Sequence, residues 1–144
     1  MAVGAARILA VRTEELRDHS REVLDTADIE SLHDMRVATR RLRAALEVFE
    51  VCFPKGRRRS ALEAVKELAD ALGERRDRDV AIASLTEFGE GLDPATRLGV
   101  SSFVETQRAE QAEVNEKLRP HVAPERVDDL CDRLQELADL AAHR

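Results

Sequence analysis

Apolar residues recur every three to four positions along most of the chain, which is the spacing of amphipathic helices. Prolines and glycines divide this pattern into five segments, and we expect helices at residues 3–24, 31–53, 60–88, 94–119 and from Pro124 onward. Asp28 or Ser31 can cap the second helix, and Asp93 can cap the fourth, with Pro94 in its first turn. No run alternates between apolar and polar residues as a strand does. The pattern predicts an all-α, antiparallel bundle of four to five helices that forms one domain over residues 1–144.

Four of the predicted helices carry an apolar line that we expect to face the core. In the first helix this line consists of Ile8, Val11, Leu16, Val23 and Leu24. In the second helix it consists of Met35, Ala38, Leu42, Ala45, Leu46, Phe49 and Phe53. In the third helix it consists of Leu62, Val65, Ala69, Leu72, Val80 and Ala83. In the fifth helix it consists of Val127, Leu130, Cys131, Leu134, Ala138 and Ala141.

Arg76 sits in the middle of the apolar line of the third helix. An unpaired buried charge is very costly, so an arginine on a core-facing line must be paired or must border a polar cavity. One interpretation is an internal ion pair with Asp34, Asp77 or Asp79. The other is a polar cavity that takes its anion from outside and has Arg59 and Lys66 at its edge.

The composition argues against several classes of protein. Aromatic residues make up 3% of the chain, with no Trp or Tyr, which argues against nucleic-acid recognition by base stacking. The scarcity of glycine and proline argues against an all-β fold. Cys52 and Cys131 lie far apart and form no metal-binding or redox motif, so we expect small core residues in a reducing compartment. No stretch is apolar enough to cross a membrane and no cleavage-like region follows the first residues, so we expect a soluble, cytoplasmic protein.

Positive charge is concentrated in one part of an otherwise acidic chain. The net charge is −6, but residues 33–59 alone carry +5, which leaves −11 for the rest. A local basic patch on an acidic body suits a confined anion site better than a general nucleic-acid coat.

The second helix has a row of basic residues roughly opposite its apolar line. His33, Arg36, Arg40 and Arg43 fall within about 80° of one another and span about 15 Å, whereas Arg41 points elsewhere. Such stacked charges repel one another, and only Glu47 can offset them, at the far end. The row is either a solvated face, or paired with acids of another helix, or a site for an extended anion that guanidinium groups bind in a bidentate way. We expect His33 in the first turn, where free backbone N–H groups favour an anion.

Two motifs resemble those of the CHAD family, the histidine-containing α-helical domain. The first is the run from His33 to Arg43, and the second is Leu72-Gly73 followed by Arg76-Asp77 and Asp79-Val80. The similarity covers roughly residues 5–119 and leaves an acidic C-terminal helix at 120–144. The resemblance implies two related helical bundles around a basic cavity, binding of inorganic polyphosphate, and association with polyphosphate granules or polyphosphate-metabolising proteins. By carry-over, the candidate phosphate ligands are His33, Arg36, Arg40, Arg43 and Arg76, with Arg59, Lys66, Arg41 and Arg58 as a secondary group.

The chain departs from the family pattern in one respect. A full-length member is similar to two copies of this unit, each with its own basic helix, and here there is one such helix. Either a homodimer restores the two-bundle arrangement, or the chain is a fragment, or the site is incomplete. We favour the homodimer, because a two-fold axis would place two arginine rows across one channel.

The leading hypothesis is a non-catalytic polyphosphate-binding protein with no cofactor and no metal, located in the cytoplasm at polyphosphate granules. The alternative is nucleic-acid binding through the same basic helix. His33-Asp34 superficially resembles metal-dependent phosphohydrolases, but the other histidines, His19, His121 and His143, show no supporting pattern, so we do not predict an enzyme. A fourth hypothesis is a structural partner that uses the apolar side of the acidic fifth helix.

Overall fold

A computed structural model describes all 144 residues of the chain as five α-helices joined by short connections, without a strand. The five are α1 (Ala2–His19), α2 (Ile29–Val48), α3 (Lys55–Gly89), α4 (Pro94–Leu118) and α5 (Pro124–Ala142). Two 3-10 turns, at Glu50–Cys52 and Arg119–Val122, precede α3 and α5. The predicted all-α bundle is confirmed.

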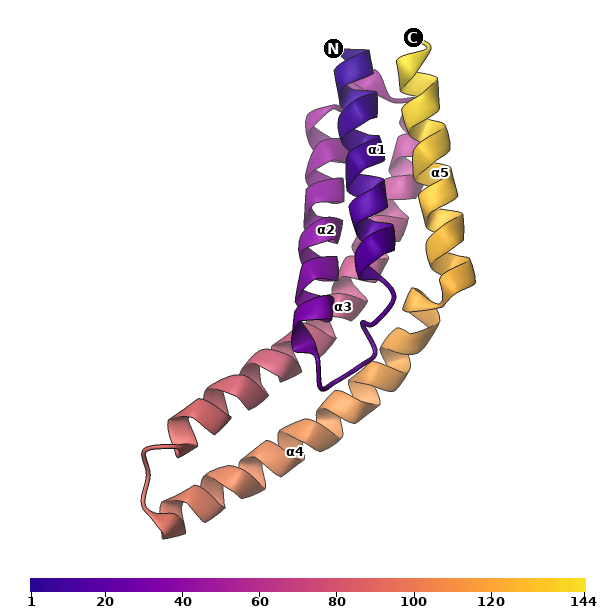
Figure 1. The fold of residues 1–144 in the computed structure, drawn as a ribbon. Coiled ribbons are helices and arrows are strands. Elements are labelled where there is room, and N and C mark those ends of the chain that lie inside the picture. The colour runs from indigo at the N-terminus through magenta and orange to yellow at the C-terminus, as the bar shows by residue number, and fades with distance from the viewer.

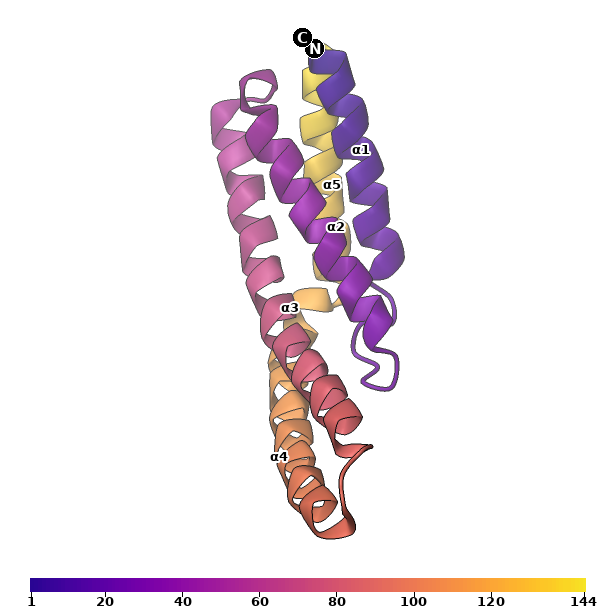
Figure 2. The same cartoon turned by 90° about the vertical axis from the view of Figure 1, so that its left-hand side faces the viewer.

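The helices form a bundle and a projecting arm (Figure 1). The bundle consists of α1, α2, the first half of α3, and α5, and both chain termini lie at its far end (Figure 1). The arm, which we define as residues 78–111, is the antiparallel hairpin of the second half of α3 with α4. It leans toward the side of the bundle on which α2 lies (Figure 1). Figure 2 looks at that side, where α2, α3 and α4 adjoin with α3 in the middle.

The apolar lines predicted for the second and fifth helices lie in the core almost as predicted. Leu42 of α2 and Leu134 of α5 are fully buried, as are most of their predicted companions. Asp28 caps α2, where its carboxylate accepts from Glu30 N at 3.2 Å, as one of the two predicted caps. The buried faces of the two helices on either side of α1 therefore follow from local pattern alone. The predicted end of the second helix was wrong, because α2 ends at Val48 rather than residue 53 and is followed by the 3-10 turn at Glu50–Cys52.

The prediction for the first helix was wrong in its end and in part of its buried line. The helix ends at His19 rather than residue 24, and both the backbone N–H and the hydroxyl of Ser20 donate to Arg17 O, the hydroxyl at 2.8 Å. Ile8 and Val11 are exposed. The buried line instead consists of Ala5, Ala6, Leu9, Thr13 and Leu16. Its alanines are small enough to let α1 pack closely between α2 and α5.

The prediction for the third helix was wrong at its start and beyond Leu72. The helix begins at Lys55 and passes through Gly73 without a break. The buried line consists of Ala61, Val65, Leu68, Leu72, Arg75, Asp79 and Ile82. Val80 and Ala83 are exposed and Arg76 is half-buried, so the arginine on the core line is Arg75, one position earlier. The buried line changes direction beyond Leu72 because α3 leaves the bundle there and packs against α4 instead.

A buried polar cluster of Arg75, Asp79, Gln111 and Asn115 joins the arm to the bundle. Arg75 Nε donates to Asp79 Oδ1 at 2.8 Å, and both side chains are fully buried. Gln111 Nε2 donates to the same carboxylate oxygen at 2.7 Å. Arg75 Nη1 also donates to Asn115 Oδ1 at 2.6 Å and to Val23 O at 2.9 Å. The cluster therefore ties α3 and α4 to each other and to the connector that follows α1.

The tip of the arm is held by the predicted cap at Asp93. Its carboxylate accepts from Thr96 Oγ1 at 2.6 Å and from Thr96 N at 3.1 Å, which lowers the pKa of Asp93 below its ordinary value. A lowered folded pKa means that the stabilisation is complete above the ordinary aspartate pKa and is lost as the pH falls through the lowered value.

We therefore expect acid to loosen the start of α4 before the bundle. Amide exchange of residues 95–97, followed from pH 5 down to pH 2, should accelerate in the parent relative to the bundle helices. In Asp93→Ala exchange there should already be fast at pH 5, because the cap is missing at every pH. The same acid response in the parent and the variant would contradict this role for Asp93.

Candidate functional site

The basic row predicted on the second helix lies on the outer side of α2. We keep the name basic row for His33, Arg36, Arg40 and Arg43. The three arginines are exposed and His33 is half-buried, whereas Met35 and Leu42 of the same helix are fully buried. The two faces are thus separated as the helical spacing predicts.

Helix α3 runs alongside the basic row and adds two cations to it. Arg36 lies across Gly73, where a Cβ would meet Arg36 Nε at 3.9 Å. Because α2 and α3 are antiparallel and rise equally per residue, this contact sets a register in which Arg76 is level with His33 and Lys66 is level with Arg43. Lys66 and Arg76 are both half-buried. We call the basic row together with Lys66 and Arg76 the basic face.

Most of the charge on the basic face has no internal partner. Arg43 Nε lies 3.1 Å from Glu47 Oε1, the pairing that the sequence predicted. No carboxylate oxygen lies within 4.0 Å of the cationic nitrogens of Arg36, Arg40, Lys66 or Arg76. The internal ion pair offered as one interpretation of Arg76 is therefore wrong, since Asp79 pairs with Arg75 instead.

The remaining secondary candidates are paired with acids of the chain. Arg41 Nη1 lies 3.7 Å from Glu15 Oε2 on α1, away from the basic row. Arg58 Nη2 lies 3.4 Å from Glu50 Oε2, and Arg59 Nε lies 3.4 Å from Glu63 Oε1. Lys66 is thus the one member of the secondary group that the structure places beside the row without an acidic partner.

His33 does not occupy the start of its helix. Because α2 begins at Ile29, His33 is its fifth residue, beyond the free N–H groups of the first turn. The expected contribution of these N–H groups to an anion site at His33 was therefore wrong. The imidazole itself has a buried Nδ1 atom with no hydrogen-bond partner. The rest of the chain therefore offers no hydrogen-bond donor or acceptor to this nitrogen.

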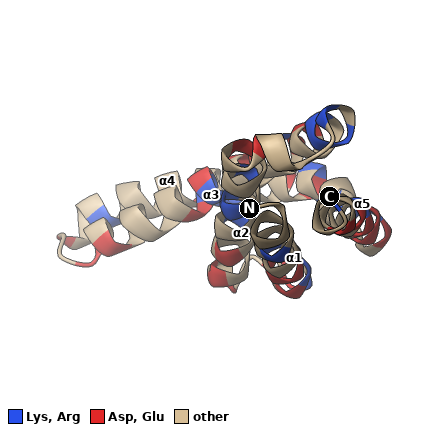
Figure 3. Ribbon diagram, turned by 90° about the horizontal axis from the view of Figure 1, so that it is seen from above, with Lys and Arg blue, Asp and Glu red and all other residues tan.

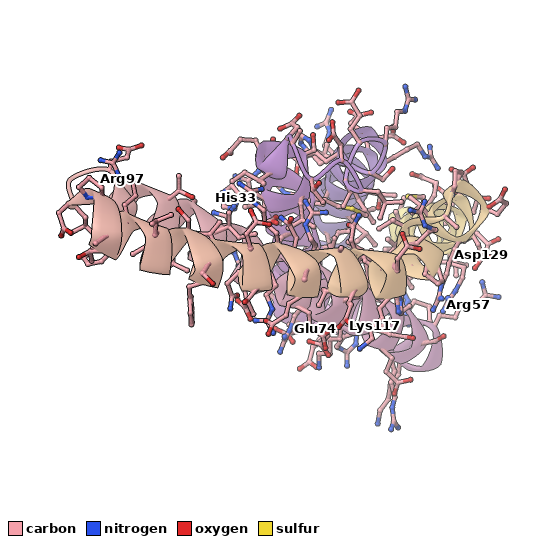
Figure 4. All side chains as sticks on the ribbon, turned by 90° about the horizontal axis from the view of Figure 1, so that it is seen from below. His33, Arg57, Glu74, Arg97, Lys117 and Asp129 are labelled. Atoms are coloured by element: carbon pink, nitrogen blue, oxygen red, sulfur yellow. The ribbon has the colours of Figure 1, made fainter.

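The bundle has a more basic side and a more acidic side. Seen from the end of the bundle, acidic positions follow α5 and basic positions gather where α2 and α3 adjoin (Figure 3). Seen from the other end, His33 lies on the α2 side of α4, whereas Glu74 and Lys117 lie together on its other side (Figure 4). Glu74 and Lys117 belong to a separate hollow of about 300 Å³ that also includes Glu67 and Asp70. Acids of that hollow do not neutralise the basic row.

Within one chain the basic face is bounded by α2 and α3. The two largest hollows lie elsewhere, one of about 420 Å³ near the tip of the arm and one of about 520 Å³ beside the start of α5. The second is lined by three arginines, Arg17, Arg21 and Arg119, but Arg17 and Arg119 are paired with acids.

No three His, Cys, Asp or Glu side chains lie together as metal ligands would. No helix is both long and apolar enough to span a membrane.

Comparison with known proteins gives one match. The CHAD domain family matches residues 7–144, a range that includes α5 beyond residue 119. Neither the search of curated proteins nor the search of solved structures found a similar protein. The matched range contains the whole basic face and extends over essentially the whole chain. The chain therefore belongs to the CHAD domain family.

Proposed function

We propose that the protein binds inorganic polyphosphate, or a similar linear polyanion, at the basic face and does so without catalysing a reaction. One observation carries the proposal: Arg36, Arg40, Lys66 and Arg76 lie on one face without an acidic partner within 4.0 Å. CHAD domains are commonly linked to polyphosphate binding, which agrees with this chemistry.

The shape of the basic face suits an extended ligand. Neighbours three or four residues apart on a helix are separated by about 5–6 Å, so the basic row offers a line of cations rather than one pocket. Guanidinium groups donate to phosphate oxygens in a bidentate way, and the half-buried Lys66 and Arg76 add charge from the α3 side. The first turn of α3 adds Lys55 as a steering charge without an acidic partner, whereas Arg57 and Arg58 beside it are paired with Glu136 and Glu50.

In the same proposal a second copy of the chain faces the basic face and supplies its missing wall. The proposal also places the protein in the cytoplasm, at polyphosphate granules or beside polyphosphate-metabolising enzymes. A homodimer of this kind would hold a polyanion between two rows related by a two-fold axis.

Salt dependence provides the first test. Each neutralised phosphate releases counterions, and a single-stranded polyanion that contacts four or five cations should show a slope of about −3 in log K against log salt. Calorimetric titration with long-chain polyphosphate should therefore give an affinity roughly 50- to 130-fold weaker at about 200 mM than at about 50 mM salt. Binding that ignores salt would contradict an electrostatic site.

Competition and turnover test the remaining parts of the proposal. At fixed salt, polyphosphate should displace duplex DNA or RNA from the protein, whereas nucleic acid should not displace polyphosphate at equal phosphate concentration. The reverse order would favour the nucleic-acid alternative. Release of orthophosphate from polyphosphate by the purified protein would contradict a non-catalytic role.

A further inference from the structure

The arm leaves large apolar side chains uncovered. Phe88 is 64% exposed, Phe103 56% and Val80 44%. Phe88 and Phe103 are two of the four aromatic residues in the chain. Four of the 25 residues from Val80 to Val104 are charged, whereas charged residues make up 36% of the whole chain. Exposed aromatics in a region poor in charge are typical of the centre of a protein interface.

Phe88 and Phe103 lie on the same side of the arm. Gly89 faces α4, because a Cβ added at this position would meet Val100 Cγ1 at 3.3 Å. Val104 lies one helical turn after Val100. Phe88 comes one residue before Gly89, and Phe103 one residue before Val104. Each phenylalanine is thus rotated by about 100° from the line along which its helix faces the other helix. Because the two helices are antiparallel, equal rotations from these facing lines point to the same side of the pair. The Gly89–Val100 contact also puts the two phenylalanines less than one helical turn apart along the arm.

This apolar side of the arm continues the side that carries the basic face. On α3, Gly73 marks the line that meets Arg36. Counting about 100° per residue, Val80 and Ser84 fall within about 20° of Gly73, and Phe88 falls within about 60°. Figure 2 looks at the side on which α2, α3 and α4 adjoin, toward which the arm leans. A partner seated on the phenylalanines therefore lies on the same side of the molecule as the basic face, about 18 Å along α3 from Arg76.

The exposed apolar area is too small to hold a partner alone. Phe88, Phe103 and Val80 together expose on the order of 300 Å², given about 200 Å² for a whole phenylalanine side chain. A stable interface needs about 800 Å² from each partner. The remainder must come from the adjoining surface, and the lean of the arm makes the α2–α3 side the surface within reach (Figure 1).

We propose that Phe88 and Phe103 form the centre of a two-fold interface with a second copy of the chain. A hairpin of two helices has little core of its own, and packing it against its symmetry mate yields a four-helix arrangement from one self-complementary patch. The interface brings each basic face beside the partner chain. That consequence rests on the proposed function, whereas the interface itself does not.

The test compares the oligomeric state of three proteins in the absence of polyanion. By light scattering and sedimentation at tens of micromolar, the parent should have twice the 16.1 kDa mass of one chain. Phe88→Glu/Phe103→Glu should be a monomer, because each substitution acts twice in a symmetric interface, with the dimer dissociation constant raised by more than about 30-fold. Leu98→Glu is the matched control, since Leu98 is 73% exposed on the same arm but about 140° from Phe103 around α4.

Each outcome decides the proposal. A dimeric parent, a dimeric Leu98→Glu and a monomeric double variant with unchanged helix content support it. If the double variant unfolds, Phe88→Ser/Phe103→Ser provides the same comparison without added charge. A monomeric parent, or a double variant that still dimerises, overturns it. Polyphosphate titration of the same samples separates the two claims. A monomer that binds overturns this interface and the wall attributed to a second copy, but leaves binding at the basic face standing. A dimer that does not bind overturns the proposed binding and leaves the interface standing.

Discussion

Reversing the charges of Arg36 and Arg40 is expected to abolish binding of long-chain polyphosphate while the helix content stays unchanged. Neither side chain has an acidic partner, so the substitution breaks no ion pair of the folded chain. A hydrogen bond to a charged group contributes about 1.5–3 kcal/mol, and Arg36→Glu/Arg40→Glu loses two such contacts and adds two repelling carboxylates. The affinity should fall by at least about 100-fold.

The control must change the net charge equally without touching the basic face. Arg7 on α1 and Arg108 on α4 are exposed and take part in no ion pair of the chain. Arg7→Glu/Arg108→Glu therefore carries the same change in total charge and should bind polyphosphate within a few-fold of the parent. Calorimetric titration at one salt concentration, with circular dichroism of each variant, makes the comparison. Equal losses in both double variants would show that total charge, and not the basic face, governs binding.

Features set within a single helix could be predicted from the sequence. The two faces of α2 follow from the spacing of Met35, Leu42 and the basic row, because each position on a helix determines its direction. The caps at Asp28 and Asp93 follow from residue types that satisfy free N–H groups. The candidate site was therefore largely visible in the sequence, since most of it lies on one regular helix.

Features that depend on contacts between distant segments could not be predicted. Arg75 and Arg76 are adjacent in the sequence and about 100° apart on α3, and both can be fitted to an apolar line that includes Leu72. The choice between them is made by Val23 O and by Asn115, which lie 52 and 40 residues away. One available signal was the spacing of four between Arg75 and Asp79, repeated between Gln111 and Asn115 on α4. The arm was invisible for the same reason, because its exposure depends on where α3 leaves the bundle.

Replacing Arg75 by methionine is expected to destabilise the fold by about 3–5 kcal/mol, which is the usual cost of removing one partner from a buried ion pair. Asp79 would remain fully buried with its charge and with Gln111 as its one donor. Val23 O and Asn115 Oδ1 would lose the donor that ties the connector to the arm. For a chain of this length, the midpoint of thermal unfolding should fall by roughly 10–15 °C.

Two further variants separate burial from charge. Arg78→Met removes a neighbouring arginine whose Nε lies 3.0 Å from Glu110 Oε2, but those side chains are 37% and 43% exposed, so the loss should stay below about 1 kcal/mol. Arg75→Met/Asp79→Leu removes both buried charges and should recover part of the stability lost in Arg75→Met, because an apolar replacement of a whole buried pair is often neutral. Urea unfolding of all three gives the free energies. If Arg75→Met and Arg78→Met cost the same, the polar cluster does not hold the arm to the bundle, and the direction of the arm must be set by the apolar contacts of α3 with α4 alone.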